Sequence, residues 1–286
     1  MFEIVNKRRL NSAVTLLEIS APRVAAKAAP GQFIILMVDK DGERIPLTIN
    51  DYNRETGTVT IIFQIVGVTT QKLSVLEKGD YISDFVGPLG EPTELDGYSN
   101  VCVIAGGVGS AIAYPQAKEL NKNGVKVDVV AGFKNKDIVI LEDEFRNACT
   151  NLYITTDDGS YAQKGFVTDK LRELIESGEK YDVVIAIGPI MMMKAISNLT
   201  REYNIKTIVS LNPIMIDGTG MCGGCRVYVG GEAKFACVDG PDFDGHLVDF
   251  DKLIFRNRLY APEEKREKEK HEQSTCNLFR GIKDAK

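Results

Sequence analysis

The stretch Val101-Cys-Val-Ile-Ala-Gly-Gly-Val-Gly-Ser110 decides the fold of the second half of this chain. Its five consecutive apolar residues are typical of a strand buried on both faces, and the glycines after them open a helix-like stretch that runs to Asn123. Further apolar runs follow, most of them separated by helical segments, at residues 125–131, 151–156, 182–187 and 207–211. Buried strands that alternate with helices predict a parallel, doubly wound α/β domain.

The first 95 residues have a different pattern. Short runs of alternating apolar and polar residues are separated by turn residues such as Pro30-Gly31 and Asp41-Gly42. Strands this close together, joined by glycine-containing turns, favour an antiparallel barrel or sandwich. The chain therefore changes architecture near residue 95.

Composition limits the classes of function. With 286 residues, 44% of them hydrophobic, the chain is long enough for two domains with buried cores. A net charge of −5 argues against nucleic acid as a partner, because phosphate neutralisation needs clustered Lys and Arg. No apolar stretch approaches the roughly 20 residues that span a bilayer, and the N-terminus lacks the apolar part of a signal peptide. We expect a cytoplasmic protein with reduced thiols and no membrane partner.

Three cysteines carry the most specific spacing in the chain. Cys222-Gly-Gly-Cys225 is followed by a predicted hairpin and then by Cys237. With Asp217 in the place of the first ligand, the spacing is that of a plant-type [2Fe–2S] site. The interspersed glycines keep side chains away from the cluster sulfurs. Zinc is the alternative, since Cys-x2-Cys also suits a zinc knuckle, although Cys237 and the nearest histidine are poorly spaced for it.

Asp217 itself has two interpretations. An aspartate before a Gly-x-Gly turn often only caps backbone amides, whereas its position five residues before Cys222 makes it a candidate iron ligand. Cys276, in the charged C-terminal part, is a possible substitute for the fourth ligand. Cys102 and Cys149 are interpreted as structural.

Two glycine-rich turns predict a dinucleotide site. The turn Gly106-Gly-Val-Gly109 follows a strand and opens a helix, which lets a pyrophosphate approach backbone amides. It departs from G-x-G-x-x-G because Ile112 takes the place of the last glycine. Gly188 ends another strand of the same sheet, and since ligands bind at the carboxyl ends of such strands, we expect both turns to line one crevice.

A third turn, Val66-Gly-Val-Thr-Thr70, lies in the first domain and also opens a helix. The positive partial charge at a helix N-terminus suits a pyrophosphate. Alternatively, Thr69 and Thr70 only cap this helix. The preceding strand that bears Thr48 is the other part of this candidate flavin site.

Together these motifs resemble the ferredoxin–NADP⁺ reductase superfamily. Within it, they are similar to the branch that contains the electron-transfer subunits of dihydroorotate dehydrogenase B and the small subunits of NADH-dependent reduced ferredoxin:NADP⁺ oxidoreductases. The resemblance covers the chain to about residue 255, and residues 210–249 are its most specific part. The oxidoreductase small subunits have an aspartate beside three cysteines, where the dehydrogenase subunits have a fourth cysteine.

The resemblance implies three cofactors and their contacts. It implies FAD on the barrel at Pro46, Leu47, Thr48, Ile62, Phe63, Gln64, Gly67, Thr69 and Thr70. It implies NAD(H) at Gly106, Gly107, Gly109 and Gly188, with Asp157 near a ribose. It implies a [2Fe–2S] cluster held by Asp217, Cys222, Cys225 and Cys237.

Two of these assignments depart from the pattern or have alternatives. The arginine that the superfamily places three residues before the hydroxyl residue is Ile45 here, and Arg44 lies one residue earlier. Asp157 and Asp158 favour NAD(H) over NADP(H) if they meet a ribose, and alternatively they form a turn with Gly159.

The expected fold is an antiparallel β-barrel FAD domain (1–95) and a doubly wound α/β NAD(P)-binding domain (96–213), followed by a [2Fe–2S]-binding segment (214–250) and a charged, partner-facing tail (251–286). The resemblance implies an electron-transferring flavoprotein subunit whose larger flavin and [4Fe–4S] partner uses NADP(H) and ferredoxin and bifurcates electrons. The alternatives are an electron-transfer subunit of dihydroorotate dehydrogenase B, sulfide dehydrogenase or a glutamate synthase-like complex, and, outside enzymes, a zinc-binding interaction protein.

Overall fold

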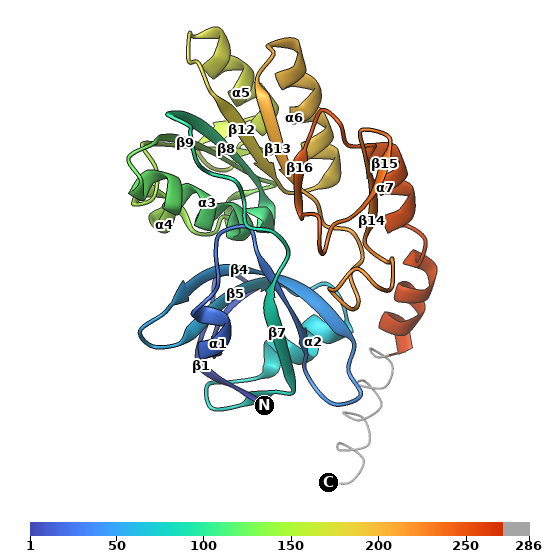
Figure 1. Cartoon of the computed structure of the whole chain (residues 1–286). Helices are drawn as coiled ribbons and strands as arrows, with labels where there is room; N and C mark the ends of the chain where they lie inside the picture. Colours follow the sequence, from blue (N-terminus) through green and yellow to red (C-terminus); the bar gives the residue numbers. More distant parts are fainter. Residues whose placement is uncertain (271–286) are drawn as a thin grey trace.

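The computed structural model describes residues 1–270, which form a barrel domain below an α/β domain (Figure 1). The barrel is a nearly closed antiparallel sheet with the strand order β6-β1-β2-β5-β4-β3-β7. Its strands are β1 (Phe2–Arg9), β2 (Val14–Ser20), β3 (Phe33–Met37), β4 (Arg44–Asn53), β5 (Thr58–Gln64), β6 (Tyr81–Ile82) and β7 (Asp84–Leu89). Two short helices accompany them, α1 (Pro22–Ala25) and α2 (Val68–Val75).

The α/β domain has a second sheet with the order β11-β10-β9-β8-β12-β13-β16. All neighbours in it are parallel except β13 and β16. Its strands are β8 (Asn100–Gly106), β9 (Lys126–Phe133), β10 (Asn151–Thr156), β11 (Gln163–Lys164), β12 (Val183–Ile187), β13 (Lys206–Ser210) and β16 (Asp242–Asp244). The strand order reverses between β8 and β12, which is where doubly wound sheets bind their ligands.

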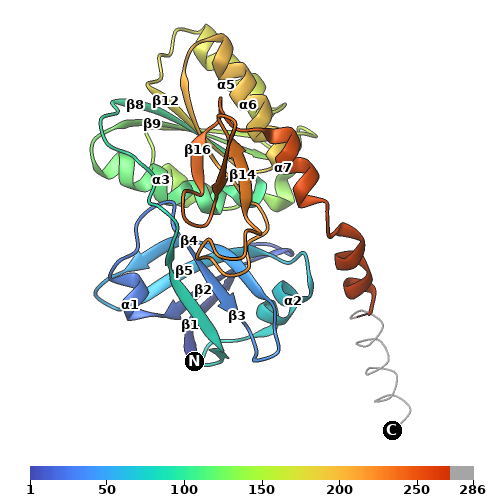
Figure 2. The ribbon, with the colours of Figure 1, turned by 45° about the vertical axis from the view of Figure 1, so that its right-hand side comes forward.

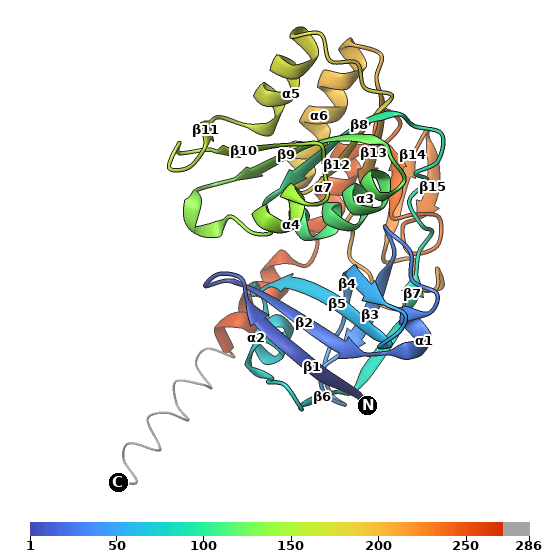
Figure 3. The same ribbon diagram turned by 90° about the vertical axis from the view of Figure 1, so that its left-hand side faces the viewer.

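Helices cover both faces of this sheet (Figure 3). Helices α3 (Ser110–Lys122) and α4 (Glu142–Arg146) lie on the face toward the barrel, and α5 (Val167–Glu176) and α6 (Ile190–Glu202) lie on the far face. Two 3₁₀ turns, η1 (Gly107–Gly109) and η2 (Lys136–Ile138), follow strand ends. The arrangement is that of a sheet sandwiched between two helical layers.

Alternation along β8 separates two cores. Cys102 and Ile104 belong to the core under α5 and α6, whereas Val103 and Ala105 pack on the α3 side. The α3-side core also contains Leu16 of the barrel, and other barrel residues on the same face. Because successive strand residues point to opposite faces, one buried strand supports both layers and the docking of the barrel.

The third part of the chain connects the two domains. It contains the hairpin β14 (Arg226–Val229) and β15 (Glu232–Phe235), then β16 and helix α7 (Phe250–Asn257). Figure 2 shows this segment, in orange, descending from the α/β domain onto the barrel. Since β16 pairs with β13, the segment is partly built into the α/β sheet.

The expected start of a charged tail at residue 251 needs correction. Phe250 and Leu253 of α7 are buried, and this helix packs against β14 and α6. The boundary therefore falls inside a packed helix whose apolar residues are spaced i, i+3. Beyond Asn257 every residue through Lys270 is exposed, and the chain is helical from Ala261 to Lys270.

The domains are joined at a defect in α3. Pro115 has no N–H, so the carbonyl of Ala111, four residues earlier, lacks its intrahelical donor. The buried side chain of Asn50 on β4 supplies it, because its Nδ2 donates to the Ala111 oxygen at 2.7 Å. The barrel thus completes the hydrogen bonding of the helix that covers it.

The fold class predicted from the sequence is confirmed: an antiparallel barrel is followed by a doubly wound α/β domain and a small C-terminal segment. Within residues 1–270, no helix is both long enough and apolar enough to cross a membrane.

We expect Asn50→Ala to lower the free energy of unfolding by about 1–3 kcal/mol, because the buried Ala111 carbonyl loses its only side-chain donor. The same substitution should cost less in a Pro115→Ala background, where residue 115 regains an N–H. Chemical denaturation of the four proteins in this cycle measures the difference, with the exposed Asn198→Ala as a control that changes stability by less than about 0.5 kcal/mol. An equal cost in both backgrounds would contradict the repair role of Asn50.

Candidate functional site

The predicted dinucleotide turns meet at the strand-order reversal. A Cβ on Gly109 would lie 2.6 Å from the carbonyl oxygen of Ile187, and one on Gly188 would lie 3.0 Å from the Cα of Gly106. A Cβ on Gly106 would meet Met192 Sδ at 2.5 Å. These three glycines are therefore required for close packing of the two turns, whereas the crevice expected beside them stays a prediction.

The turn at Gly107 has an open backbone, and two buried hydroxyls of this domain are unpaired. Gly107 has a φ of 56° and no atom within 4 Å of its Cβ position, so its backbone is open to a ligand. Ser110 Oγ and Thr155 Oγ1 are buried without a hydrogen-bond partner in the described part of the chain. Ser110 is the first residue of α3, whose N-terminus carries positive partial charge. An anionic, hydrogen-bonding group such as a dinucleotide fits this loop.

Asp157 and Asp158 differ in their surroundings. Asp158 Oδ1 accepts the N–H of Ser160 at 2.9 Å, and hydrogen bonds from Ser160 lower the pKa of Asp158. The turn interpretation therefore holds for Asp158. Asp157 follows β10 directly, is exposed, and keeps its carboxylate free of ion pairs with residues 1–270. Of the two carboxylates, that of Asp157 is available to a ligand.

Successive side chains of β4 point to opposite faces of the barrel sheet. Pro46 pairs with Ile35 of β3 and Thr48 pairs with Phe33, so the side chains of each pair share a face. Phe33 and Ile35 belong to the core beneath the C-terminal segment. Leu47 instead packs against the barrel core. Pro46 and Thr48 are therefore the β4 members of the expected set that face the domain junction.

The β5 residues divide in the same way. Ile62 packs with the α3-side core between the domains, and Gln64 is exposed. Phe63 lies between them in sequence and points into the barrel core, where it is 2% exposed. Only the backbone of Phe63 is available to a flavin, because successive side chains on a strand alternate in direction.

The turn before α2 is largely satisfied by the protein itself. Thr70 Oγ1 accepts the N–H groups of Val66 and Gly67, both at 3.0 Å, and donates to the Gly67 carbonyl. Thr69 donates its hydroxyl to Glu43 at 2.8 Å. Thr70 thus caps the helix, as the alternative interpretation predicts. Its hydroxyl bonds the amides of Val66 and Gly67, so the N-terminal amides of α2 itself are left for a pyrophosphate.

The cysteine segment brings its ligands together. The sulfurs of Cys225 and Cys237 lie 3.1 Å apart, slightly closer than the roughly 3.8 Å between two thiolates on one tetrahedral metal with bonds of about 2.3 Å. Gly224 N–H donates to Cys222 Sγ at 3.4 Å, the kind of amide contact that cluster sulfurs receive. Burial raises the pKa of Cys237 to about 12, and Cys225 adds to the rise. Iron binding at this pair has to displace protons.

Asp217 performs the turn role that its position predicts. Its carboxylate accepts the N–H of Thr219 at 2.9 Å and the N–H of Cys222 at 2.7 Å. These bonds hold the pKa of Asp217 below its ordinary value. The bond to Cys222 places the carboxylate at the cysteine run, and its charge also acts on Cys237. The four residues therefore lie around one loop.

The loop rests on the barrel. A Cβ on Gly218 would lie 2.7 Å from both Ile35 and Leu89, so only glycine lets the loop approach β3 and β7 this closely. Met215 and Cys225 share a core with Ile35. The C-terminal segment is thereby packed on the barrel face that also carries Pro46 and Thr48.

The donor set and backbone fit a [2Fe–2S] cluster better than a single metal ion. Across residues 1–270, no three His, Cys, Asp or Glu side chains are arranged to hold one ion. The proposed ligands are instead one close thiol pair plus Cys222 and Asp217 on the adjoining turn, as two irons sharing four ligands require. Cys276 lies outside the described residues.

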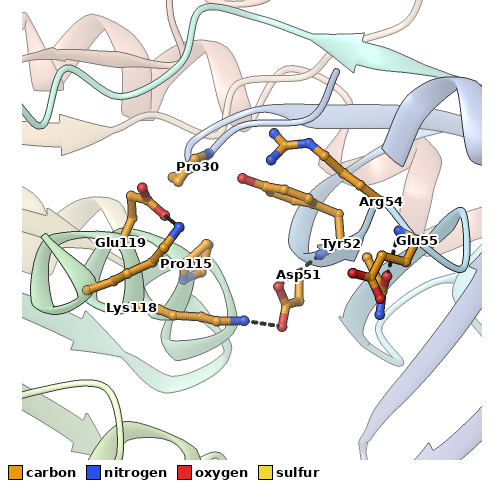
Figure 4. Close-up of a pocket in the computed structure, with 10 residues that line it drawn as sticks. Pro30, Asp51, Tyr52, Arg54, Glu55, Pro115, Lys118 and Glu119 are labelled. Atoms are coloured by element: carbon orange, nitrogen blue, oxygen red, sulfur yellow. Dashed lines mark hydrogen bonds and ion pairs between the residues drawn. The ribbon is translucent and has the colours of Figure 1, made fainter. Parts of the chain in front are cut away.

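A separate pocket of about 450 Å³ lies where the end of β4 meets α3 (Figure 4). Four of its charged side chains form two ion pairs: Lys118 with Asp51 at 2.7 Å, and Lys122 with Glu119 at 3.6 Å. It contains none of the residues predicted to hold a cofactor. This pocket is therefore not part of the candidate site.

Some residues of the site escaped the sequence interpretation. Ser110 and Thr155 became visible only through their unpaired hydroxyls. Ser110 directly follows the selected Gly109, and Thr155 is the last but one residue of β10, so their position near the carboxyl end of a buried strand was the available signal.

Residues 212–249 match the family model described as the iron–sulfur cluster binding domain of dihydroorotate dehydrogenase B. A Thermotoga maritima protein described as a homolog of the dihydroorotate dehydrogenase B (NAD⁺) electron transfer subunit is 46% identical over 263 residues, which cover 92% of this chain and 93% of that protein. An uncharacterized Clostridium beijerinckii protein encoded in the adh 3′ region is 54% identical over 272 residues, 92% of each chain.

The chain is also similar to a solved structure from work on flavin-based electron bifurcation by NADH-dependent reduced ferredoxin-NADP oxidoreductase. The two align with a TM-score of 0.90 and 45% identity, over 95% of this chain and 98% of the other. An Amycolatopsis cytochrome P450 reductase aligns with a TM-score of 0.57 over 70% of this chain and 65% of its own, at 19% identity, which indicates a shared fold.

Three substitutions of Asp217 separate its two roles. We expect Asp217→Ala to lower iron content, because Thr219 and Cys222 lose their acceptor. Asp217→Asn keeps a carbonyl acceptor for the turn but not the charge. Asp217→Cys should retain about two irons per chain at a lower reduction potential, since thiolate ligands give lower potentials than less donating ones.

Iron analysis and redox titration of these variants measure both effects. An Asp217→Asn protein with unchanged iron content and unchanged potential would limit Asp217 to the turn.

Proposed function

Because the chain belongs to the family of dihydroorotate dehydrogenase B electron-transfer subunits and their homologues, we propose that it is the small, NADH-oxidising subunit of an NADH-dependent reduced ferredoxin:NADP⁺ oxidoreductase. The predicted class, an electron-transferring oxidoreductase subunit, is confirmed by these similarities. So is the expected cofactor set of FAD, NAD(H) and a [2Fe–2S] cluster. The matched iron–sulfur domain argues against the zinc-binding interaction protein.

One observation carries the proposal: β4 stands between the other two parts of the site. Through Asn50 it bonds the first turn of α3, which continues from the dinucleotide loop. Through the pairs Pro46–Ile35 and Thr48–Phe33 it adjoins the strand on which the cysteine segment rests. The expected nicotinamide, flavin and cluster residues are thus arranged in the order in which electrons would pass.

The chemistry that the bound groups supply is hydride transfer between NAD(H) and FAD and one-electron transfer at the cluster. The chain's own residues bind and orient. Gly106, Gly107 and Gly109 would present backbone amides to the dinucleotide, and Gly188 closes the other side of the crevice. On the barrel, Thr48 and the N-terminal amides of α2 would hold FAD, with Gly67 giving the open turn.

Pro46, Ile62 and Gln64 would line the flavin together with the backbones of Leu47 and Phe63. Cys222, Cys225 and Cys237 would hold the cluster, and Asp217 would complete the set. The amide contacts to the Cys222 sulfur and the Asp217 carboxylate orient these ligands before metal binds.

The chain works as an electron-transfer subunit beside a larger catalytic partner, as its homologues do. We propose that the partner is a flavin and [4Fe–4S] subunit that uses NADP(H) and ferredoxin, and that the complex bifurcates electrons in the cytoplasm. The identity of 45% over 98% of a chain from the bifurcating oxidoreductase supports this choice. Asp217, in place of a fourth cysteine, supports it as well.

Anaerobic purification of the tagged chain from its own host tests the proposed function. We expect one FAD and about two cluster irons per copy of this chain, and a larger flavin and [4Fe–4S] protein in the same preparation. Cys225→Ser should lose the [2Fe–2S] signal, whereas Cys149→Ser, a half-buried cysteine outside the segment, should keep it. Zinc without flavin would overturn the proposal, and a dihydroorotate-oxidising partner would favour the alternative enzyme.

We expect Asp157→Ala to raise the KM for NADH roughly three- to tenfold with little change in kcat, because a ribose hydrogen bond contributes about 0.5–1.5 kcal/mol. Asp158→Ala is the matched control, since Asp158 is used in its own turn. Its KM should stay within about twofold of wild type. Steady-state reduction of an artificial acceptor, with NADH and with NADPH as the electron donor, gives KM and kcat. Equal effects of the two substitutions would remove Asp157 from the binding site.

A further inference from the structure

Asp242, on β16, lies where four parts of the chain meet. The residues just before it are pinned by main-chain bonds: Gly240 O accepts Glu91 N–H at 2.7 Å, and Pro241 O accepts Leu211 N–H at 2.9 Å. Its own Oδ2 lies 2.5 Å from Thr93 Oγ1 in the linker between the domains. The chain therefore holds this carboxyl group at a fixed place between the cysteine segment and both domains.

The barrel and the α/β domain reach the same point. A Cβ on Gly31 of the barrel would lie 2.1 Å from Thr93 Oγ1 and 3.2 Å from Asp242 Oδ2. Gln116 of α3 is fully buried and its amide lies 3.3 Å from Thr93 Oγ1. The hydroxyl of Thr93 is thus shared between Asp242 on one side and Gln116 on the other.

The orientation of the Gln116 amide indicates which groups of this network carry the protons. When the Gln116 nitrogen faces the carbonyls of Ile112 and Ala113 and its oxygen faces Thr93, both ends of the amide have hydrogen-bond partners. In the opposite orientation the amide oxygen faces those two carbonyl oxygens, and none of the three atoms can donate. In this orientation Thr93 donates its single proton to Gln116. The 2.5 Å contact between Thr93 and Asp242 is then made by a proton on Asp242, whereas an ionised Asp242 would take the Thr93 proton and leave the Gln116 oxygen without a donor.

Burial leads to the same protonation state. Asp242 Oδ1 is buried and has no partner within residues 1–270. An unpaired oxygen costs far less on a neutral acid than on a carboxylate. Accordingly, burial raises the pKa of Asp242, and the neighbouring hydroxyls of Ser210 and Thr93 offset only part of the rise.

Within residues 1–270, no charged side chain pairs with the Asp242 carboxyl. The groups that face the carboxyl are the hydroxyls of Ser210 on β13 and of Thr93, with the Gln116 amide beyond. The acidic side chains on neighbouring positions, Glu91, Glu94 and Asp244, are all exposed. The nearest cation on β13, Lys206, instead donates to Tyr98 Oη at 2.7 Å.

We propose that Asp242 carries a proton in the working protein, and that this neutral acid is the positioning residue that holds the iron–sulfur segment against the barrel and the dinucleotide domain. The consequence for electron transfer rests on the proposed function, since Cys237 lies five residues before Asp242. Ionisation would bury an unpaired charge at the junction and weaken its contacts. An acid with a raised folded pKa stabilises the folded state fully below its ordinary pKa, and this contribution is lost as the pH rises through the raised pKa.

Infrared spectroscopy of the full chain with isotope-labelled aspartate tests the proton directly and needs no cofactor. We expect the band of a protonated carboxyl at neutral pH in the wild type and in Asp244→Asn, an exposed control on the same strand. The band should be absent from Asp242→Asn. A wild-type spectrum without this band at neutral pH would overturn the proposal.

The positioning role is tested in the complete complex by the rate of cluster reduction after mixing with NADH. Asp242→Asn, whose amide donates as the acid does, should stay within about twofold of wild type at neutral pH. Asp242→Ala should slow the step by at least about fivefold, because small displacements of reacting groups have large kinetic effects. The wild-type rate should fall as the pH rises through the raised pKa, whereas Asp242→Asn stays flat.

Identical pH profiles for wild type and Asp242→Asn would overturn the positioning role. If Asp242→Ala does not fold, the comparison of the wild-type and Asp242→Asn pH profiles still tests the positioning role. A wild-type protein without a cluster would count against the proposed function instead. In that case the pH dependence of unfolding takes the place of the rate, and Asp242→Asn should remove the loss of stability that Asp242 contributes as the pH rises through its raised pKa.

Discussion

The arrangement of the site depends on one carbonyl group, that of Ala111. Pro115 deprives it of its helical donor, and Asn50 of the barrel supplies another. A helix that needs a donor from outside can be completed in only one docked position. Since α3 begins at the loop of residues 106–109 and Asn50 lies two residues beyond Thr48, the same bond that repairs the helix also sets the distance between this loop and β4.

The alternation of side-chain direction along β3 and β4 then links this junction to the cysteine segment. Neighbouring strands lie about 4.8 Å apart, and cross-strand partners point the same way. Pro46 and Thr48 therefore stand beside Ile35 and Phe33, and the cysteine segment rests on that pair through Gly218. The three parts of the site are joined by direct packing rather than by flexible linkers. Cofactors bound there would be held at fixed separations, which electron transfer requires.

Patterns that are local in sequence were enough to predict much of this. The buried run before Gly106 predicts the central strand, and the spacing of Cys222, Cys225 and Cys237 predicts their convergence. Period-two alternation also implies that Ile62 and Phe63 face opposite ways, but it does not say which of them faces the core. That choice is made by docking of the α/β domain, so the inward direction of Phe63 required the structure.

The contacts that escaped prediction join distant parts of the chain. Asp242, Thr93 and Gln116 meet only because β16 enters the α/β sheet and the linker crosses beside it. No periodicity of a single strand contains that information. The packing of α7 was missed for another reason, since Phe250 and Leu253 form an apolar stripe of only one turn within a charged stretch.

The two interpretations of Asp217 depend on the same property. A carboxylate that accepts two amides is kept ionised by them, which the lowered pKa reflects. Each oxygen retains lone-pair capacity beyond its single amide bond. The hydrogen bonds that make Asp217 a turn residue thus also prepare an oriented anion beside Cys222. A cysteine at this position could donate more charge to iron, but it could not cap both amides. An aspartate therefore exchanges electron donation for a preorganised loop, and the less donating ligand favours a higher cluster potential.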